Sequence, residues 1–297
     1  MEKNIKVIKI IPQGYCKGVV CAIKTINNLL KEDTHKKPYY MLGKLVHNTH
    51  VTDAYQDLGI KIIDEYSNIS KGTIIVTAHG LSQKQKQDIK NKGLDLVDTT
   101  CQEVLRIETT VQEKIDDGYT VLYYGKLNHP ECKSIMSINS KIHLLTCIED
   151  INQLDILDDK IYFTNQTTMS YLDLIEIVNT LKMKYHNITF DIDICNASKS
   201  RQLALLNCLD KCNLIVVVGD KLSNNTMKLK ELCEKNNKDV VLVENIDDIS
   251  NIKFIPNMTI GVTAGASTPN KLVDEVINKI KDSHYISKFT NNDYISF

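Results

Sequence analysis

Short apolar runs alternate with amphipathic segments along most of the chain. Residues 7–11, 94–97 and 188–194 are apolar or alternating runs of strand length, and each precedes a segment in which apolar residues recur at helical spacing. After residue 100, for example, Val104, Ile107 and Val111 share one helical face. Strands that alternate with helices in this way predict an α/β protein with mainly parallel sheets.

A cysteine lies at each of these three junctions between a strand and a helix. Cys16, Cys101 and Cys195 all come directly after the strand and its turn, where the next helix begins. Unpaired backbone N–H groups and the positive end of the helix dipole favour a thiolate over a thiol at such a position. We therefore expect these cysteines to be better metal ligands than cysteines in a core.

The pattern after each cysteine is also repeated. A helix and a strand lead to a glycine-containing turn at residues 42–47, 124–129 and 218–223, and a second strand and turn follow at 74–82, 161–170 and 259–267. We interpret this as three pseudo-equivalent α/β lobes, which we place at residues 16–100, 101–192 and 193–297. The N-terminal strand within residues 1–15 is expected to join the sheet of the third lobe. Since ligands of open α/β sheets bind beyond the carboxyl ends of the strands, we expect the turns to surround a central cavity.

Several local features have simpler structural interpretations. Ser82, Ser170 and either Ser267 or Thr268 are predicted helix caps, with Pro269 early in its helix. The lysine-rich run 84–92 is predicted to be a solvated helix face. The other six cysteines are expected to be small buried apolar residues, because cysteine is among the most buried residue types: Cys21, Cys132, Cys147, Cys208, Cys212 and Cys233.

Composition mainly excludes classes of partner. The chain has 297 residues and a net charge of -1, so no basic surface predicts binding to nucleic acid. No apolar run approaches the roughly 20 residues that cross a bilayer, and the N-terminus lacks a secretory segment. Nine cysteines without a regular spacing favour a reducing compartment. We expect a cytoplasmic protein without a membrane partner, or a protein of a plastid-type stroma if a transit peptide has been removed.

Three thiolates allow two kinds of centre. They could bind zinc and leave its fourth position open, or hold a [4Fe-4S] cluster at three of its four irons. Donors from His47, His79, His129 and the turns that carry Ser223, Asn225 and Ser267 suit a diphosphate. Glu131 is the carboxyl group that we assign to the turn tips, where it could donate a proton. These residues alone leave open a reductase, a zinc-dependent hydrolase and a non-catalytic iron-sulphur sensor.

The turns together resemble one family, the 4-hydroxy-3-methylbut-2-enyl diphosphate reductases, also called the LytB family. These enzymes carry out the last step of the non-mevalonate isoprenoid pathway. The matching stretches lie in family order and include Gly14-Tyr-Cys-Lys-Gly-Val, Leu45-Val-His-Asn, Ala78-His-Gly-Leu-Ser, Asp98-Thr-Thr-Cys, Asn128-His-Pro-Glu, Gln166-Thr-Thr-Met-Ser, Asp193-Ile-Cys-Asn-Ala-Ser and Thr263-Ala-Gly-Ala-Ser. The family usually has Ser-Ser-Asn where this chain has Ser223-Asn224-Asn225, and an amide can still donate to phosphate.

The resemblance implies an iron-sulphur oxidoreductase with a [4Fe-4S] cluster bound by Cys16, Cys101 and Cys195, and with one open iron site. It implies reductive dehydroxylation of (E)-4-hydroxy-3-methylbut-2-enyl diphosphate to isopentenyl and dimethylallyl diphosphate, with electrons from a ferredoxin or flavodoxin. Glu131 would be the proton donor, with Thr167 and His129 as further catalytic residues. The implied substrate-binding residues are His47, His79, His129, Thr167, Thr168, Ser223, Asn224, Asn225 and Ser267.

Overall fold

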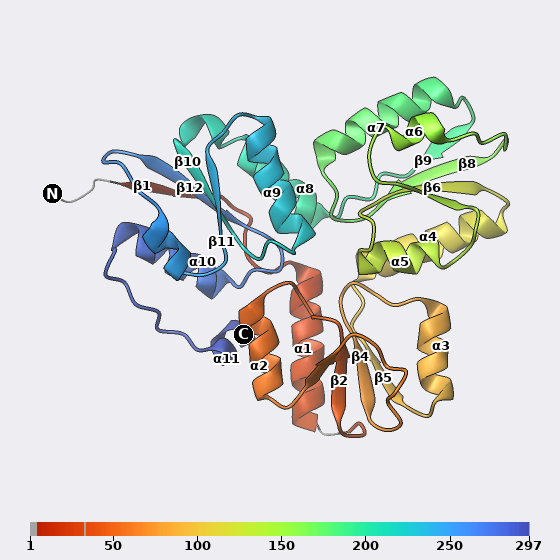
Figure 1. Ribbon diagram of the computed structural model, residues 1–297, viewed down its shortest axis with the longest axis horizontal. Helices are drawn as coiled ribbons and strands as arrows, with labels where there is room; N and C mark the ends of the chain where they lie inside the picture. The colour runs from red at the N-terminus through yellow and green to blue at the C-terminus, as the bar shows by residue number, and fades with distance from the viewer. Residues whose placement is uncertain (1–4, 33, 297) are drawn as a thin grey trace. The chain divides into compact units, whose positions relative to one another are not determined.

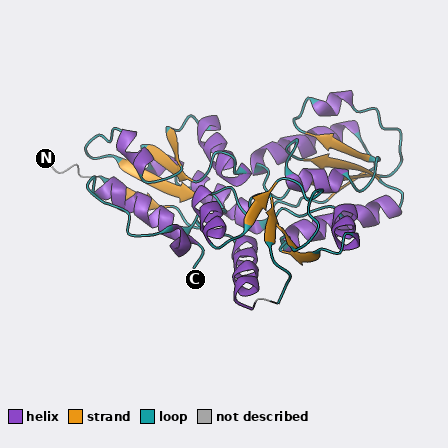
Figure 2. Ribbon diagram, turned by 60° about the horizontal axis from the view of Figure 1, so that its bottom comes forward, coloured by secondary structure: helices purple, strands orange, loops and turns teal. Residues whose placement is uncertain are grey.

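The computed structural model describes residues 5–32 and 34–296 and contains three four-stranded sheets (Figure 1). All strand pairs in the three sheets are parallel. Helices in purple flank the orange strands in Figure 2. The expected α/β class, with three lobes built on parallel sheets, is therefore confirmed.

One sheet unites the N-terminus with the last third of the chain. Its strand order is β1-β12-β10-β11, with β1 at Lys6–Lys9, β10 at Leu214–Val218, β11 at Val240–Val243 and β12 at Thr259–Ala264. Lys6 pairs with Thr259 and Lys9 with Val262 in the parallel ladder. This is the sheet that we expected the N-terminal strand to join; residues 1–4 of that segment lie outside the described residues.

The other two sheets have the same plan. One has the order β3-β2-β4-β5, with β2 at Tyr39–Leu42, β3 at Lys61–Ile63, β4 at Thr73–Val76 and β5 at Asp95–Asp98. The other has the order β7-β6-β8-β9, with β6 at Thr120–Tyr124, β7 at Ile142–Leu145, β8 at Ile161–Asn165 and β9 at Ile188–Phe190. In each sheet the strand before the glycine turn is paired with the strand before the second turn, so the two turns leave the sheet at the same edge.

Helices connect most successive strands, but no helix lies between β3 and β4. The described helices are α1 Lys17–Glu32, α2 Thr49–Asp57, α3 Gln83–Asn91, α4 Gln102–Asp116, α5 Pro130–Met136, α6 Asp150–Gln153, α7 Tyr171–Lys184, α8 Asn196–Leu206, α9 Asn224–Lys235, α10 Asn270–Lys281 and α11 Asn291–Tyr294, with the 3-10 helices η1 Leu209–Lys211 and η2 Asp247–Asn251. In the part of the chain that the structure describes, no helix is long and apolar enough to cross a membrane.

The chain divides into two compact units. One contains the described parts of residues 1–24, 44–60 and 196–297, and therefore the sheet with β1 and β12. The other contains the described parts of residues 25–43 and 61–195, and therefore the remaining two sheets. The lobe boundaries expected from the sequence, near residues 100 and 193, stay a prediction.

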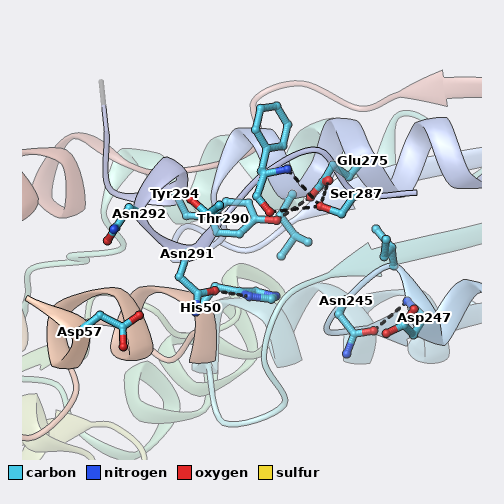
Figure 3. A pocket seen from close by; sticks show the side chains of 13 residues that line it. His50, Asp57, Asn245, Asp247, Glu275, Ser287, Thr290, Asn291, Asn292 and Tyr294 are labelled. Atoms are coloured by element: carbon cyan, nitrogen blue, oxygen red, sulfur yellow. Dashed lines mark hydrogen bonds between the residues drawn. The ribbon is translucent and has the colours of Figure 1, made fainter. Parts of the chain in front are cut away.

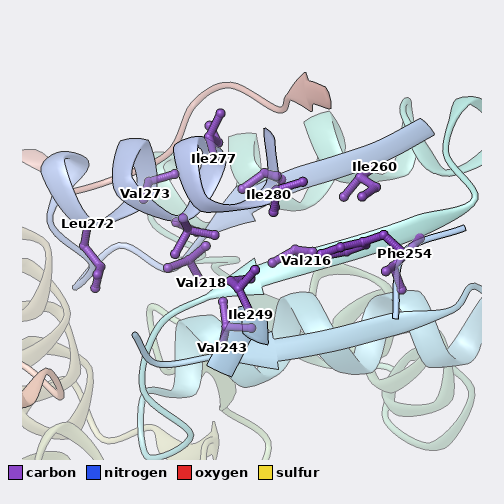
Figure 4. Close-up of a cluster of buried hydrophobic side chains, with 14 of the residues drawn as sticks. Val216, Val218, Val243, Ile249, Phe254, Ile260, Leu272, Val273, Ile277 and Ile280 are labelled. Carbon is purple, nitrogen blue, oxygen red and sulfur yellow. The ribbon is translucent and has the colours of Figure 1, made fainter. Parts of the chain in front are cut away.

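Buried apolar side chains line both faces of β10, a central strand of the sheet with β1. Val216 and Val218 point into a cluster with Leu272, Val273 and other residues of α10 (Figure 4). Ile215 and Val217 face the opposite way, into a cluster with residues of α8 and α9. A strand that is buried on both faces reads as a continuous apolar run, as 214–218 does.

Two expectations about local structure need correction. Ser82 and Ser170 cap α3 and α7 as predicted, but α10 has Pro269 at its N-cap and no side-chain cap, so neither Ser267 nor Thr268 caps it. Lys86 is not solvated: it is 6% exposed and forms an ion pair with Asp98 at 2.8 Å. Position 86 falls on the face of α3 that packs inward with Ile89, so the lysine is buried despite its charge.

The expectation for the other cysteines is correct only in part. Cys132, Cys212 and Cys233 are buried, and burial raises the pKa of each of these thiols. Cys208 is partly exposed, while Cys21 and Cys147 are exposed. Cys21 lies on α1 and Cys147 in the segment after β7, and both positions face solvent regardless of the preference of the residue type.

Candidate functional site

The three junction cysteines have the same local structure. Cys101 is the N-cap residue of α4, while Cys16 and Cys195 directly precede α1 and α8. All three side chains are partly exposed. The backbone N–H of each cysteine donates to a carbonyl in a second-strand turn: Cys16 to Ala266 at 3.1 Å, Cys101 to Ala78 at 3.0 Å and Cys195 to Thr167 at 3.1 Å. Each cysteine is thus fixed against the turn in which we expected substrate-binding residues.

Glu131 is a buried carboxyl group near the start of α5, with an exposure of 2%. The backbone N–H of Thr167 donates to its Oε1 atom at 2.9 Å, and the Thr167 hydroxyl donates to its Oε2 atom at the same distance. The Tyr123 hydroxyl also donates to Oε1, over a longer distance of 3.4 Å. Both carboxyl oxygens are therefore held by donors from β6 and from the turn after β8.

Burial is the main influence on the acidity of this group. It raises the pKa of Glu131 from the ordinary value of 4.5 to about 7, and the hydrogen bonds from Thr167 and Tyr123 limit the rise. The nearby charge of Glu108 raises the pKa further. A carboxyl group with this pKa holds a proton in a large fraction of molecules at neutral pH, as a proton donor requires.

Two of the predicted histidines lie near the start of α5, which carries Glu131. His129 is the N-cap residue of α5, and its Nδ1 atom accepts a hydrogen bond from the Glu131 backbone N–H at 3.2 Å. The rings of His79 and His129 stack edge to face with centroids 5.5 Å apart. The Nδ1 atom of His79 is also 3.4 Å from the Thr77 hydroxyl. Both imidazoles are partly exposed, so their remaining edges can reach a ligand.

These contacts connect six predicted site residues within the unit of residues 25–43 and 61–195. The Ala78 carbonyl, which accepts from the Cys101 N–H, precedes His79, and the His79 ring stacks on that of His129. His129 is hydrogen-bonded to the Glu131 backbone, and the Glu131 carboxyl group to Thr167. The Thr167 carbonyl accepts from the Cys195 N–H. Thr168 lies next to it and accepts a hydrogen bond from Gln166 at 2.9 Å. Two thiols, two imidazoles and one buried carboxyl group therefore belong to a single connected cluster.

A second group of predicted residues lies in the other unit. Ser223 caps α9, and the Ser267 hydroxyl donates to the Ser223 hydroxyl at 3.1 Å. Asn225 donates to Ser198 at 2.9 Å, whereas its buried Oδ1 atom has no hydrogen-bond partner. Asn224 opens α9 and is buried. Hydroxyl and amide groups at the N-terminus of a 12-residue helix suit an anionic ligand.

Cys16 and His47 also belong to that unit. The Cys16 backbone N–H donates to the carbonyl of Ala266, the residue before Ser267 of the hydroxyl pair. His47 is partly exposed in the turn that precedes α2. The unit therefore contains the third thiol together with the polar side chains that we expected to bind a diphosphate.

Two glycines allow the turns around these hydroxyl groups to pack closely. A Cβ atom at Gly219 would lie 2.5 Å from the Thr226 hydroxyl oxygen and 2.7 Å from that of Thr268. A Cβ atom at Gly265 would lie 2.2 Å from the same Thr226 oxygen. Gly219 also has a φ angle of +145°, which side chains rarely adopt. The repeated glycine thus has a steric role at this turn.

The sequence analysis missed two residues that support the site. Tyr123 bonds to Glu131 from β6, and Ser198 holds Asn225 from α8. Ser198 lies within the motif Asp193-Ile-Cys-Asn-Ala-Ser, which could have drawn attention to it. Tyr123 lies in an apolar strand, where a tyrosine is most simply a core residue.

A separate cavity lies in the unit with α10 and α11 (Figure 3). Its volume is about 510 Å³, and its lining includes His50, Glu275 and Tyr294. Glu275 accepts hydrogen bonds from the hydroxyls of Ser287 and Tyr294, while His50 contacts Asn291 at 3.1 Å. None of the residues predicted for the site lines this cavity. The bonds to Glu275 connect Ser287 and Tyr294 of the C-terminal segment to α10.

Comparison with known proteins gives a consistent result. Residues 7–281 match the family model described as LytB protein. A 4-hydroxy-3-methylbut-2-enyl diphosphate reductase of Geobacillus sp. (strain WCH70) is 38% identical over 97% of this chain and 92% of its own length. The enzyme of the same description from Macrococcus caseolyticus (strain JCSC5402) is 40% identical over 93% of this chain and 89% of its own length.

Solved structures agree with the sequence relatives. The E-1-hydroxy-2-methyl-but-2-enyl-4-diphosphate reductase from Plasmodium falciparum has a TM-score of 0.87 and 28% identity, over 98% of this chain and 97% of that one. A structure of (E)-4-hydroxy-3-methyl-but-2-enyl diphosphate reductase, described as the terminal enzyme of the non-mevalonate pathway, has a TM-score of 0.67 at 25% identity. It covers 93% of this chain and 99% of the other. With its three parallel sheets, its repeated cysteine turns and a family match over nearly its whole length, this chain belongs to the LytB protein family.

Proposed function

We propose that the chain reduces (E)-4-hydroxy-3-methylbut-2-enyl diphosphate to isopentenyl diphosphate and dimethylallyl diphosphate. This is the reaction of the enzymes after which its relatives are named, and the pathway step of one structural neighbour. One feature of the site carries the proposal: the buried Glu131, whose pKa is raised to about 7 and whose two oxygens are held by Thr167. Removal of a hydroxyl group as water requires such a proton donor.

The donor set suits a [4Fe-4S] cluster bound through Cys16, Cys101 and Cys195, with one iron left open. All three thiols are partly exposed at the start of a helix, and three cysteine thiolates can hold such a cluster at three of its four irons. When bound, the cluster supplies electrons one at a time. A protein electron donor of the ferredoxin or flavodoxin type is the proposed source of these electrons.

The residues of the chain would bind the substrate and move protons. Ser223, Asn225 and Ser267, with Asn224 and His47 of the same unit, would bind the diphosphate through their donors. In the other unit His79, His129 and Thr168 would complete the polar surroundings. Thr167 would hold the substrate hydroxyl beside Glu131, which donates a proton so that the hydroxyl leaves as water. The complete reaction consumes two electrons and two protons.

The cofactor is tested on protein that has been purified without oxygen. We expect about four iron and four acid-labile sulphide per chain, the content of one [4Fe-4S] cluster. Cys101→Ser should lose the cluster and the activity together. Cys147→Ser, at an exposed cysteine that we do not assign as a ligand, should keep both. Stoichiometric zinc without sulphide would contradict the proposal and favour hydrolysis.

The proton donor is tested by Glu131→Gln, which keeps the shape of the side chain but carries no acidic proton. We expect the rate of formation of both diphosphate products to fall by about a hundredfold or more, while the iron content stays unchanged. Glu176→Gln, at an exposed glutamate of α7, is the matched control and should behave as the unmodified protein does. Full activity of Glu131→Gln would refute the assignment.

A further inference from the structure

The chain contains only two arginines, and both contact a loop that carries a proposed cluster ligand. Arg106 and Arg201 are the arginines among its 36 lysine and arginine residues. Arg106 lies in the second turn of α4, which begins directly after Cys101. Arg201 lies in the second turn of α8, which begins directly after Cys195. The two arginines therefore have equivalent positions in the repeated pattern of cysteine and helix.

Arg106 holds the loop before Cys195. Its Nη2 atom donates to the Oδ1 atom of Asp193, two residues before Cys195, and the two groups form an ion pair. Asp193 is 4% exposed, and its Oδ2 atom accepts from the Thr164 hydroxyl at 3.0 Å. The Nε atom of Arg106 also lies 3.5 Å from a carboxylate oxygen of Glu103, in the first turn of α4. One guanidinium thus joins the loop before Cys195 to the start of α4.

Arg201 holds the loop before Cys16 in a similar way. This arginine is buried, and its Nη2 atom donates to the carbonyl of Gly14, two residues before Cys16, at 2.5 Å. Its Nη1 atom donates to the carbonyl of Ala197, in the first turn of α8, at 2.7 Å. Gly14 has a φ angle of +75°, and a Cβ atom there would lie 1.6 Å from the Asn270 Oδ1 atom. The Gly14 backbone is therefore held closely between α8 and α10.

The third cysteine loop is held by a lysine. Lys86, on α3, forms an ion pair at 2.8 Å with Asp98, three residues before Cys101. An ammonium group is a compact point charge that suits such a pair, whereas a guanidinium is a rigid, planar set of donors that can join two acceptors. Arg106 and Arg201 each join an acceptor in a cysteine loop to an acceptor in the first turn of a helix. A lysine cannot make both of these contacts with the same geometry.

The loops held by the arginines have no regular secondary structure. Residues 11–16 and 191–195 contain neither helix nor strand. The backbone N–H groups of Cys16 and Cys195 are bonded to the turns after β12 and β8. The arginine contact adds a second point of attachment two residues earlier in the chain. A ligand that is already held in its binding conformation loses less conformational entropy when it binds a metal.

We infer that Arg106 and Arg201 are positioning residues, which hold the loops of Cys195 and Cys16 in the conformation in which these cysteines bind the cluster. Arg106 relates two ligands to each other, because the helix that carries it begins after Cys101 and the loop that it holds carries Cys195. Each arginine acts through the loop that it contacts. The inference rests on the proposed function, in which these cysteines are the cluster ligands.

The first test measures thiol reactivity in the cluster-free, reduced protein, so it does not depend on the cofactor. The alkylation rate of each cysteine with iodoacetamide is followed by mass spectrometry of its peptides. In Arg106→Lys we expect Cys195 to react at least about threefold faster, because its loop opens more often. In Arg201→Lys we expect an increase of about the same size for Cys16. Cys101, whose loop is held by a lysine, is the internal reference and should keep its rate in both variants.

The second test measures how firmly the loaded protein holds its cluster. Loss of a side chain that orients a metal ligand typically weakens metal binding at least about tenfold, so Arg106→Lys should release iron to a chelator about tenfold faster, without oxygen and from the same starting iron content. Lys90→Arg exchanges the same two residue types in reverse at an exposed position of α3, and it should leave the rate of iron release unchanged.

A general loss of stability would increase the alkylation of every cysteine, including the buried Cys132 and Cys212, and this outcome would overturn the inference. An unchanged Cys195 rate or unchanged iron release in Arg106→Lys would overturn it as well. The Arg106 side chain is about half exposed, so we expect its variant to fold even if that of Arg201 does not, and its result then decides. If the unmodified protein binds no iron-sulphur cluster, the proposed function fails, while the alkylation rates still show whether the arginines hold the loops.

Discussion

The raised pKa of Glu131 predicts a measurable effect on stability, independent of catalysis. Between pH 4.5 and about pH 7 the folded protein keeps a proton on Glu131 that the unfolded chain has released. The folded state therefore binds more protons in this window, and its stability falls as the pH rises. Because each pK unit corresponds to about 1.4 kcal/mol, the rise from 4.5 to about 7 amounts to roughly 3 kcal/mol lost above neutral pH.

Glu131→Gln should remove this loss, because glutamine is neutral at every pH. Its amide oxygen can accept from the Thr167 N–H, and its amide N–H can donate to the Thr167 hydroxyl oxygen, so the local contacts survive. The stability of the variant relative to the unmodified protein should thus increase as the pH rises, by about 3 kcal/mol between about pH 5 and pH 8. For a chain of this length that difference corresponds to roughly 5 °C in Tm.

The assay is thermal unfolding of both proteins without oxygen, with the same iron content, followed by circular dichroism across this pH range. The comparison is a difference between variants at each pH, so contributions shared by both proteins cancel. Parallel Tm profiles would refute the reasoning, since they would mean that Glu131 does not titrate between these pH values in the folded protein. We expect Glu131→Gln to be more stable than the unmodified protein at high pH and to lose turnover, because burial of this carboxyl group costs stability but keeps it protonated near neutral pH.

Three further predictions concern the turns. Thr167→Val removes a hydrogen bond to the Glu131 carboxylate worth about 1.5–3 kcal/mol, so the pKa of Glu131 should rise. The alkaline limb of the kcat–pH profile should therefore move to higher pH by at least about one unit. A limb that stays in place or moves to lower pH would contradict this. Gly265→Ala should lower stability by about 1–3 kcal/mol in thermal unfolding, because the new Cβ atom would lie 2.2 Å from the Thr226 hydroxyl oxygen. Adding Thr226→Ala removes this oxygen and should recover most of the loss; no recovery would show that the clash is not the cause. Ser223→Ala should raise KM for the diphosphate substrate and, because it removes the cap of α9, lower stability by about 1 kcal/mol. Ser82→Ala, which removes the cap of α3, should lower stability by about the same amount but leave KM unchanged. Equal KM values in the two variants would argue against a diphosphate role for Ser223.

The periodic pattern of the chain predicted the architecture because that pattern has a direct physical cause. Runs such as 214–218 are apolar at every position, since each strand of a parallel sheet is covered by helices on both faces. The repeated cysteine and glycine turns lie where strands end, and β1, near the N-terminus, pairs with β12 of the last third of the chain. The two helix caps that depend only on local sequence, Ser82 and Ser170, were predictable for the same reason.

Local pattern failed where tertiary packing decided the outcome. The cap of α10 lies at Pro269 because the preceding hydroxyl of Thr268 donates to the carbonyl of Val218 on a neighbouring strand. Lys86 reads as one of several solvated lysines, yet it is buried beside Asp98. Helical spacing tells which residues share a face, but the depth at which that face is buried depends on the elements that cover it.

The site shows the same division. The sequence by itself determined which residue types stand at the ends of the strands, and so which thiols, imidazoles, hydroxyls and carboxyl group are available for chemistry. Only the tertiary structure decided the acidity of Glu131, because its pKa depends on burial and on the donors Thr167, in the turn after β8, and Tyr123, on β6. Local propensities act over a few residues, whereas desolvation and charge act through space between segments that the fold brings together.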